Sequence, residues 1–134
     1  MGGPAFELQK AIYTALSGDA ALLGLATGGV FDCPQEDISF PYVTIGDDTL
    51  SDWSAKTFDG KEATITIHSW SQAMGREELK KIMDRIDTLL HNGTLSMTGH
   101  SLVMMQFEFA ETLRDPDGRT YHGVQRFRAF IKEA

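Results

Sequence analysis

The chain has 134 residues, of which 42% are hydrophobic and 23% charged, so its composition predicts one globular core and argues against disorder. Its formal net charge of −7 argues against nucleic-acid binding through clustered Lys and Arg. The chain has a single cysteine, Cys33, and no apolar run of the ~20 residues that span a membrane. Because it also has no recognisable leader, we expect a protein made in the cytoplasm. No repeat or long linker divides it, so residues 1–134 are expected to form one domain.

Charge is distributed unevenly along the chain. Residues 114–134 carry more Lys and Arg than Asp and Glu, whereas the rest of the chain is acidic. Such polarity would steer head-to-tail contact between copies, and an ordinary solvated strand face explains the same cations equally well.

The predicted elements begin with a helix over residues 4–17, which opens on a proline suited to the first turn and ends at Gly18. Asp19 is placed to cap a short second helix. Val30 and Phe31 then indicate a brief strand.

A stronger strand follows Pro41 and places Val43 and Ile45 on one face. A glycine and two acidic residues interrupt it, and segment 47–60 is predicted to be a mobile loop or a projecting hairpin arm that orders on assembly. Residues 61–70 alternate between apolar and polar side chains, which predicts a half-buried strand.

The strongest helical pattern comes next and ends at Gly93. Its apolar residues recur at helical spacing: Leu79, Ile82, Met83, Ile86, Leu89 and Leu90.

Two long strands complete the pattern, and residues 115–118 form the turn between them. The first strand, 102–113, is expected to point four residues inward: Val103, Met105, Phe107 and Phe109. The second, 121–131, is expected to point three inward: Phe127, Ala129 and Ile131. An unpaired edge on this last strand would invite a neighbouring subunit.

Strand runs with two helices, and no regular strand–helix alternation, predict an α+β fold. We expect an antiparallel β-sheet with the N-terminal helix and the long amphipathic helix packed on one face, and a long C-terminal β-hairpin.

No catalytic, metal-binding or cofactor-binding residues are predicted, and no cofactor is expected. The histidines are scattered rather than set at zinc-ligand spacing: His68, His91, His100 and His122. Asp115 and Asp117 begin like a calcium loop, but its remaining ligands are missing, so a turn is favoured. Three loop acids lack the apolar surroundings that acid–base work requires: Asp47, Asp48 and Asp52.

Seven residues are candidates for a subunit or partner interface because they combine large aromatics beside polar loops with arginines on the outer face of the last strand. They are Trp53, Phe58, Trp70, His122, Arg126, Arg128 and Phe130. For the aromatics, folding back over the edge of the domain's own core is an equally good interpretation.

Four runs of sequence in this order resemble the tail-completion, or tail-terminator, family of siphovirus-type phages and gene transfer agents. They are LSGDAAL at 16–22, FPYVTIG at 40–46, HSWS at 68–71 with Gly75 after it, and RDPDGRTYHGVQRFR at 114–128. The resemblance covers nearly the whole chain.

This resemblance implies a non-enzymatic subunit of a hexameric ring in the tail of a particle assembled in the bacterial host. The ring would cap the tail tube, end its elongation and provide the surface that joins the head. Its partners would be further copies of itself, the major tail tube protein and a head–tail connector or stopper. DNA would pass through the ring without specific binding. Before assembly the protein could be a monomer in solution. Three alternatives remain: a head-completion adaptor, a peptide-binding module, and a small enzyme using His68 and His122.

Overall fold

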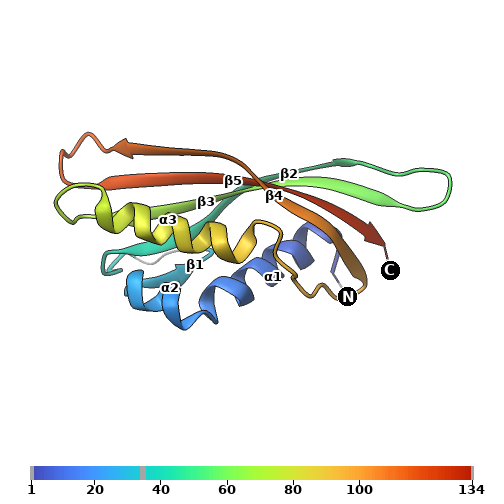
Figure 1. Ribbon diagram of the computed structural model, residues 1–134, viewed down its shortest axis with the longest axis horizontal. Helices are drawn as coiled ribbons and strands as arrows, with labels where there is room; N and C mark the ends of the chain where they lie inside the picture. The colour runs from blue at the N-terminus through green and yellow to red at the C-terminus, as the bar shows by residue number, and fades with distance from the viewer. Residues whose placement is uncertain (1, 34–35, 134) are drawn as a thin grey trace.

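The computed structural model describes residues 2–33 and 36–133, and it has the α+β architecture that the sequence predicts (Figure 1). The elements in chain order are α1 (Pro4–Ser17), α2 (Ala20–Leu25), β1 (Gly29–Phe31), β2 (Tyr42–Asp52), β3 (Gly60–Ser71), α3 (Glu77–Leu90), β4 (His100–Arg114) and β5 (Tyr121–Glu133). The strands form one sheet in the order β1-β2-β3-β5-β4. Neighbours are antiparallel except β1, which runs parallel to β2.

The helices are joined by an ion pair at the start of α2. As predicted, the Asp19 carboxylate caps α2, accepting a hydrogen bond from the Leu22 amide at 2.8 Å. The same carboxylate accepts two further bonds from the Arg85 guanidinium of α3, each 2.8 Å long. One side chain therefore both starts α2 and holds it against α3.

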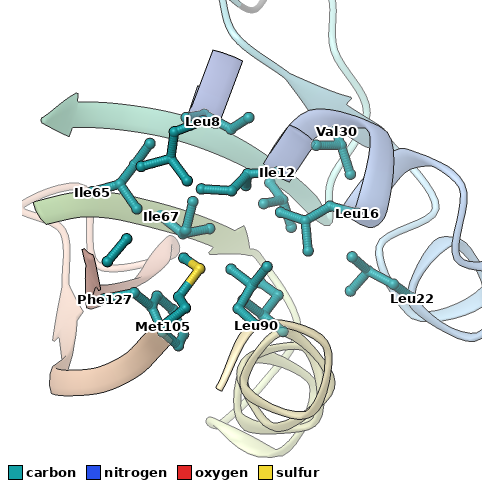
Figure 2. Close-up of a cluster of buried hydrophobic side chains, with 14 of the residues drawn as sticks. Leu8, Ile12, Leu16, Leu22, Val30, Ile65, Ile67, Leu90, Met105 and Phe127 are labelled. Atoms are coloured by element: carbon teal, nitrogen blue, oxygen red, sulfur yellow. The ribbon is translucent and has the colours of Figure 1, made fainter. Parts of the chain in front are cut away.

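The hydrophobic core lies between one face of the sheet and the three helices (Figure 2). Ile65 and Ile67 of β3 pack there with Leu8 and Ile12 of α1, which confirms the alternation predicted for β3. Full burial of one such side chain stabilises the fold by roughly 1.5–3 kcal/mol. The helical face predicted for α3 is also inward, since all but Leu89 of its six predicted apolar residues are buried.

Strand β2 continues through the acidic segment that is expected to interrupt it. A bulge between Ile45 and Asp48 absorbs the irregularity, and pairing with β3 resumes as far as Asp52 opposite Lys61. The β2–β3 hairpin then extends beyond the helices at one end of the molecule (Figure 1). Of the two conformations predicted for segment 47–60, a mobile loop and a projecting hairpin arm, the structure agrees with the hairpin arm.

The predicted inward face of β4 is wrong at two of its four positions, Val103 and Phe109, which are 48% and 42% exposed. Met105 is fully buried, and Phe107 lies opposite the buried Phe127 on the helix side but is 41% exposed because β4 is the edge strand. Bulges between Leu102 and Met104 and between Phe107 and Phe109 shift the alternation, and Phe109 then lies opposite Arg126 instead of over the core. The alternation of inward and outward side chains along a strand is shifted wherever a bulge inserts an extra residue.

The sheet edge also differs from the expectation. Strand β5 lies between β3 and β4, so both of its sides are paired and β4 forms the edge. The inward residues predicted for β5 are nonetheless confirmed, because Phe127, Ala129 and Ile131 are buried in the core.

Candidate assembly surface

The sheet has an open face, defined as the side opposite the helices, and all seven predicted interface residues belong to it. On β5 the buried residues alternate with His122, Arg126, Arg128 and Phe130, which therefore point away from the helices. Trp70 lies directly opposite His122 on the neighbouring β3. The remaining two, Trp53 and Phe58, lie at the end of the arm, where Trp53 contacts the ring of Phe130.

At the arm end of the open face, three aromatic rings pack together. Trp53 lies 5.2 Å from Phe58 and 4.9 Å from Phe130 between ring centroids, and the Lys132 ammonium lies 4.4 Å from the centroid of Phe58. Gly60 makes this packing possible, because a Cβ there would stand 2.8 Å from a ring carbon of Trp53 and 2.9 Å from one of Phe58. The cluster packs the end of the arm against β5.

At the opposite end of the same face, rings from three strands form a column. Trp70 stacks on His122 with centroids 3.8 Å apart and planes inclined by 9°, and Tyr42 of β2 stacks against Trp70 at a centroid distance of 6.1 Å. The indole N–H of Trp70 donates to the hydroxyl of Thr44 at 3.4 Å. The column places flat, half-exposed rings where a partner could pack.

Arginines occupy the middle of the open face. Arg128 joins Glu62 of β3 to Glu108 of β4, with N–O distances of 2.7 and 2.6 Å. Arg126 is exposed and its guanidinium carbon lies 5.9 Å from the ring centroid of Phe109. Arg128 is therefore neutralised within the chain, whereas Arg126 presents its charge outward.

His68 and His122, which are 54 residues apart in sequence, are in direct contact. The Nδ1 of His68 and the Nε2 of His122 are 2.7 Å apart, so one imidazole donates to the other. Burial lowers the pKa of His68, and burial together with the neighbouring His68 lowers the pKa of His122. Both effects favour a neutral pair at neutral pH.

The other polar groups considered for chemistry are possible metal ligands and the loop acids. Among the described residues, no three His, Cys, Asp or Glu side chains lie close enough to hold a metal ion. The loop acids Asp47, Asp48 and Asp52 are exposed, and Asp52 is bonded to Ser54 and paired with Lys61. Within residues 2–33 and 36–133, no helix is long and apolar enough to cross a membrane.

A further part of the surface is not predicted from the sequence. Strand β4 exposes five large hydrophobic side chains: Val103, Met104, Phe107, Phe109 and Leu113. Simple alternation predicts three of them to point inward, and only the bulges and the edge position reveal their exposure. The one sequence signal is the pair of glutamates within an otherwise apolar run, since charge on a strand is typical of a protected edge.

A family described as tail completion protein gp17 matches residues 10–132 of the chain. Tail completion protein gp17 of Bacillus phage SPP1 is 30% identical over 124 residues, which cover 92% of this chain and 91% of that protein. Both matches extend over the helices, the sheet and the candidate surface.

Solved structures give the same comparison in three dimensions. A chain from the virion of a native gene transfer agent particle is similar with a TM-score of 0.90 and 26% identity, covering 98% of this chain and 99% of that one. The structure of bacteriophage SPP1 gp17 is similar with a TM-score of 0.65 and 28% identity, covering 93% of this chain and 88% of that one.

Proposed function

Because this chain belongs to the tail completion protein family represented by gp17, we propose that it is the subunit of a tail-terminator ring. The ring, expected to be hexameric, caps the tail tube, ends its elongation and provides the surface that joins the head. The protein acts as a structural component of a phage or gene transfer agent particle and not as an enzyme.

One observation carries this proposal: among the described residues, no helix or strand packs over the open face of the sheet. The open face presents the aromatic column and Arg126, and the adjoining edge strand exposes five large hydrophobic side chains. Exposed apolar surface of this kind is typical of protein–protein interfaces. It supports contacts with further copies, with the major tail tube protein and with a head–tail connector or stopper.

The acidic composition is compatible with a ring through which DNA passes. With a net charge of −7, the subunit as a whole repels a polyanion. We therefore expect no retention of the protein on duplex DNA at physiological salt, and tight binding there would contradict this part of the proposal.

Negative-stain microscopy of cognate tail tubes tests the proposed function. Tubes grown with this protein should carry a ring at one end and stop lengthening, whereas tubes grown without it should continue. A protein that leaves length and tube ends unchanged is not a terminator.

A head-completion adaptor is the second candidate, because the same surface could bind the portal side of the joint. Particles that lack this protein separate the two functions. Overlong or ragged tails indicate a terminator, while tails of normal length that fail to join heads indicate an adaptor.

The enzyme alternative depends on the imidazole pair described above. If His68 and His122 carried an activity, replacing both with alanine would abolish it. The structural role predicts instead that His68→Ala still caps tubes.

A further inference from the structure

A groove of about 410 Å³ runs between α3 and the edge strand β4, on the helix side of the sheet. The aliphatic and aromatic part of its lining includes Met83, Phe107 and Ala110. Asp84 and Asp87 of α3 outnumber Lys80 along it, so the groove carries net negative charge. Its chemistry suits a segment that combines an apolar stem with a cation.

Two acceptors at this groove have no partner among residues 2–33 and 36–133. Gln125 is 2% exposed, and although its Nε2 donates to the Met83 carbonyl at 2.8 Å, its Oε1 accepts nothing there. The Oδ1 of Asp87 is likewise buried without a donor. Since buried polar atoms are nearly always paired, the groove lacks hydrogen-bond donors that an occupant would bring.

The backbone edge beside the groove is open over only part of β4. At the start of the groove, the Asn92 amide donates to the Met105 carbonyl at 2.7 Å, and the Phe107 amide donates to Nδ1 of His91 at 2.9 Å. The chain after α3 thus covers this part of the edge itself. In the described part of the chain, no loop does the same for residues 108–114, which flank the groove.

The arm carries a cation suited to this groove. Lys56 lies in the exposed turn closed by the Ala55 and Phe58 backbones, and in the part of the chain that the structure describes its ammonium has no ion pair or ring contact. Outside the groove, two other exposed cations among the described residues also lack an ion pair or ring contact. Lys10 lies on α1 and Arg119 in the β4–β5 turn, so neither is on the arm.

The arm of one copy cannot reach its own groove. Ala110 pairs with Gln125, which pairs with Ile67, and Ile67 is separated from Gly60 at the base of the arm by roughly 23 Å of strand. The arm tip continues away from Gly60, and α3 lies toward the other end of the sheet (Figure 1). Only a second molecule can bring Lys56 to the groove.

We propose that the arm tip of one copy docks in the α3–β4 groove of the next copy, with the Lys56 ammonium against the carboxylates of Asp84 and Asp87. This inference rests on the proposed ring and names the contact that closes it. Because arm and groove lie at opposite ends of the sheet, the contact is head-to-tail, and a pair of copies keeps one free arm and one free groove. Repetition then generates a ring once the rotation closes.

Charge favours this contact over a direct pairing of sheet edges. The free edge of β2 beyond β1 contains Asp47, Asp48 and Asp52, and the free edge of β4 contains Glu108 and Glu111. Placing these edges side by side would bring carboxylates together, which is destabilising. The turn at the arm tip, residues 53–59, instead carries Lys56 with Asp59 as its one carboxylate, so it can bring a cation to the groove without the cluster of acids on the β2 edge.

Charge reversal on cognate tail tubes tests the contact. We expect Lys56→Glu to raise the protein concentration needed to cap half of the tubes roughly tenfold or more. Lys10→Glu is the matched control, since it makes the same change on an exposed helix, and should stay within about twofold of wild type. Adding Asp84→Lys to Lys56→Glu should recover most of the loss. Equal effects of the two single changes, or no recovery in the double variant, would overturn the inference.

Crosslinking provides a second and independent measurement. In a Cys33→Ser background, Thr57→Cys and Ala110→Cys in one chain, which leave Lys56 in place, should give a ladder of covalent multimers with a short bismaleimide reagent, on tubes and in concentrated protein. The pair Lys10→Cys and Ala110→Cys should not. Capping without a ladder overturns the arm contact and leaves the proposed function intact, whereas a ladder from protein that never caps tubes supports the contact and rejects the terminator role.

Discussion

Asp19 combines a helix cap and an ion pair, so it should contribute more stability than an ordinary surface carboxylate. The hydrogen bonds from Arg85 hold the pKa of Asp19 at about 2, below its usual value of 3.8, with help from the Leu22 amide. We expect Asp19→Ala to lower the free energy of unfolding by about 1–3 kcal/mol, measured by urea denaturation at pH 7. Asp19→Asn keeps a capping oxygen and should lose less.

The same carboxylate gives a defined dependence on pH. Because its pKa is lower in the folded state, its contribution is fully present above the unfolded value of 3.8 and disappears as the pH falls toward 2. The wild type and Asp19→Ala should therefore converge in stability across this window. A constant difference between them down to pH 2 would show that the ion pair is not responsible.

The imidazole pair of His68 and His122 should affect stability in a different pH range. Burial lowers the pKa of both His68 and His122 below the unfolded value of 6.5, so the unfolded chain takes up their protons first as the pH falls. Stability should therefore decrease as the pH falls below about 6.5 until the folded histidines are protonated as well. The flanking acids that oppose this effect are Asp47 beside His68, and Asp115 and Glu111 near His122.

Thermal unfolding of the double variant His68→Asn/His122→Asn between pH 7 and 5 measures this contribution. Its midpoint should fall less over this range than that of the wild type. Parallel curves for the two proteins would mean that the pair does not titrate differently in the folded and unfolded chain.

At the scale of elements, two glycines give opposite predictions. An alanine at Gly60 would push its Cβ against the Trp53 carbonyl, 2.7 Å away, and against the rings of the arm cluster, so Gly60→Ala should destabilise by about 1–3 kcal/mol. Gly24 is inside α2, and a Cβ added there would meet nothing within 4 Å, so Gly24→Ala should stabilise by roughly 0.5–1 kcal/mol. Calorimetric midpoints of the two variants check both signs.

The elements that the sequence predicts best are those whose periodicity is not disturbed. Strand β3 and helix α3 keep their buried residues at regular spacing, so their inward faces follow from the sequence. Strand β4 is equally regular in sequence, yet its two bulges move Phe109 to the open face, and a bulge depends on the partner strand. Which strand forms the edge is likewise a property of strand order, which local patterns do not determine.

The candidate surface is predictable only in part for the same reason. Stranded aromatics such as Trp53 and Trp70 can be recognised one at a time, because large rings beside polar loops lack an obvious place in the core. The contact between His68 and His122 requires the register of β3 with β5, which places Trp70 opposite His122 and His68 opposite Val124. The groove between α3 and β4 arises from how these two elements pack together, so the sequence of neither element alone predicts it.

For the whole molecule, the charges at the proposed contact between copies predict how assembly responds to salt. If Lys56 and the acidic groove join neighbouring copies, their attraction is screened as the Debye length shrinks from about 10 Å at 0.1 M to about 3 Å at 1 M. The concentration that half-saturates capping should then rise with salt by roughly three- to tenfold over that range. The Lys56→Glu variant serves as the reference, because it should show a flat or reversed salt dependence.

The edge strand has a consequence for the life of the free subunit before it meets a tail. Exposed Phe and Met side chains along an edge strand, which is paired on one side only, are a template for aggregation. Two bulges bend this strand, residues 91–92 cover part of it, and two identical copies pairing edge to edge would place Glu108 and Glu111 of one against the same carboxylates of the other. These features oppose the pairing of one β4 edge with another.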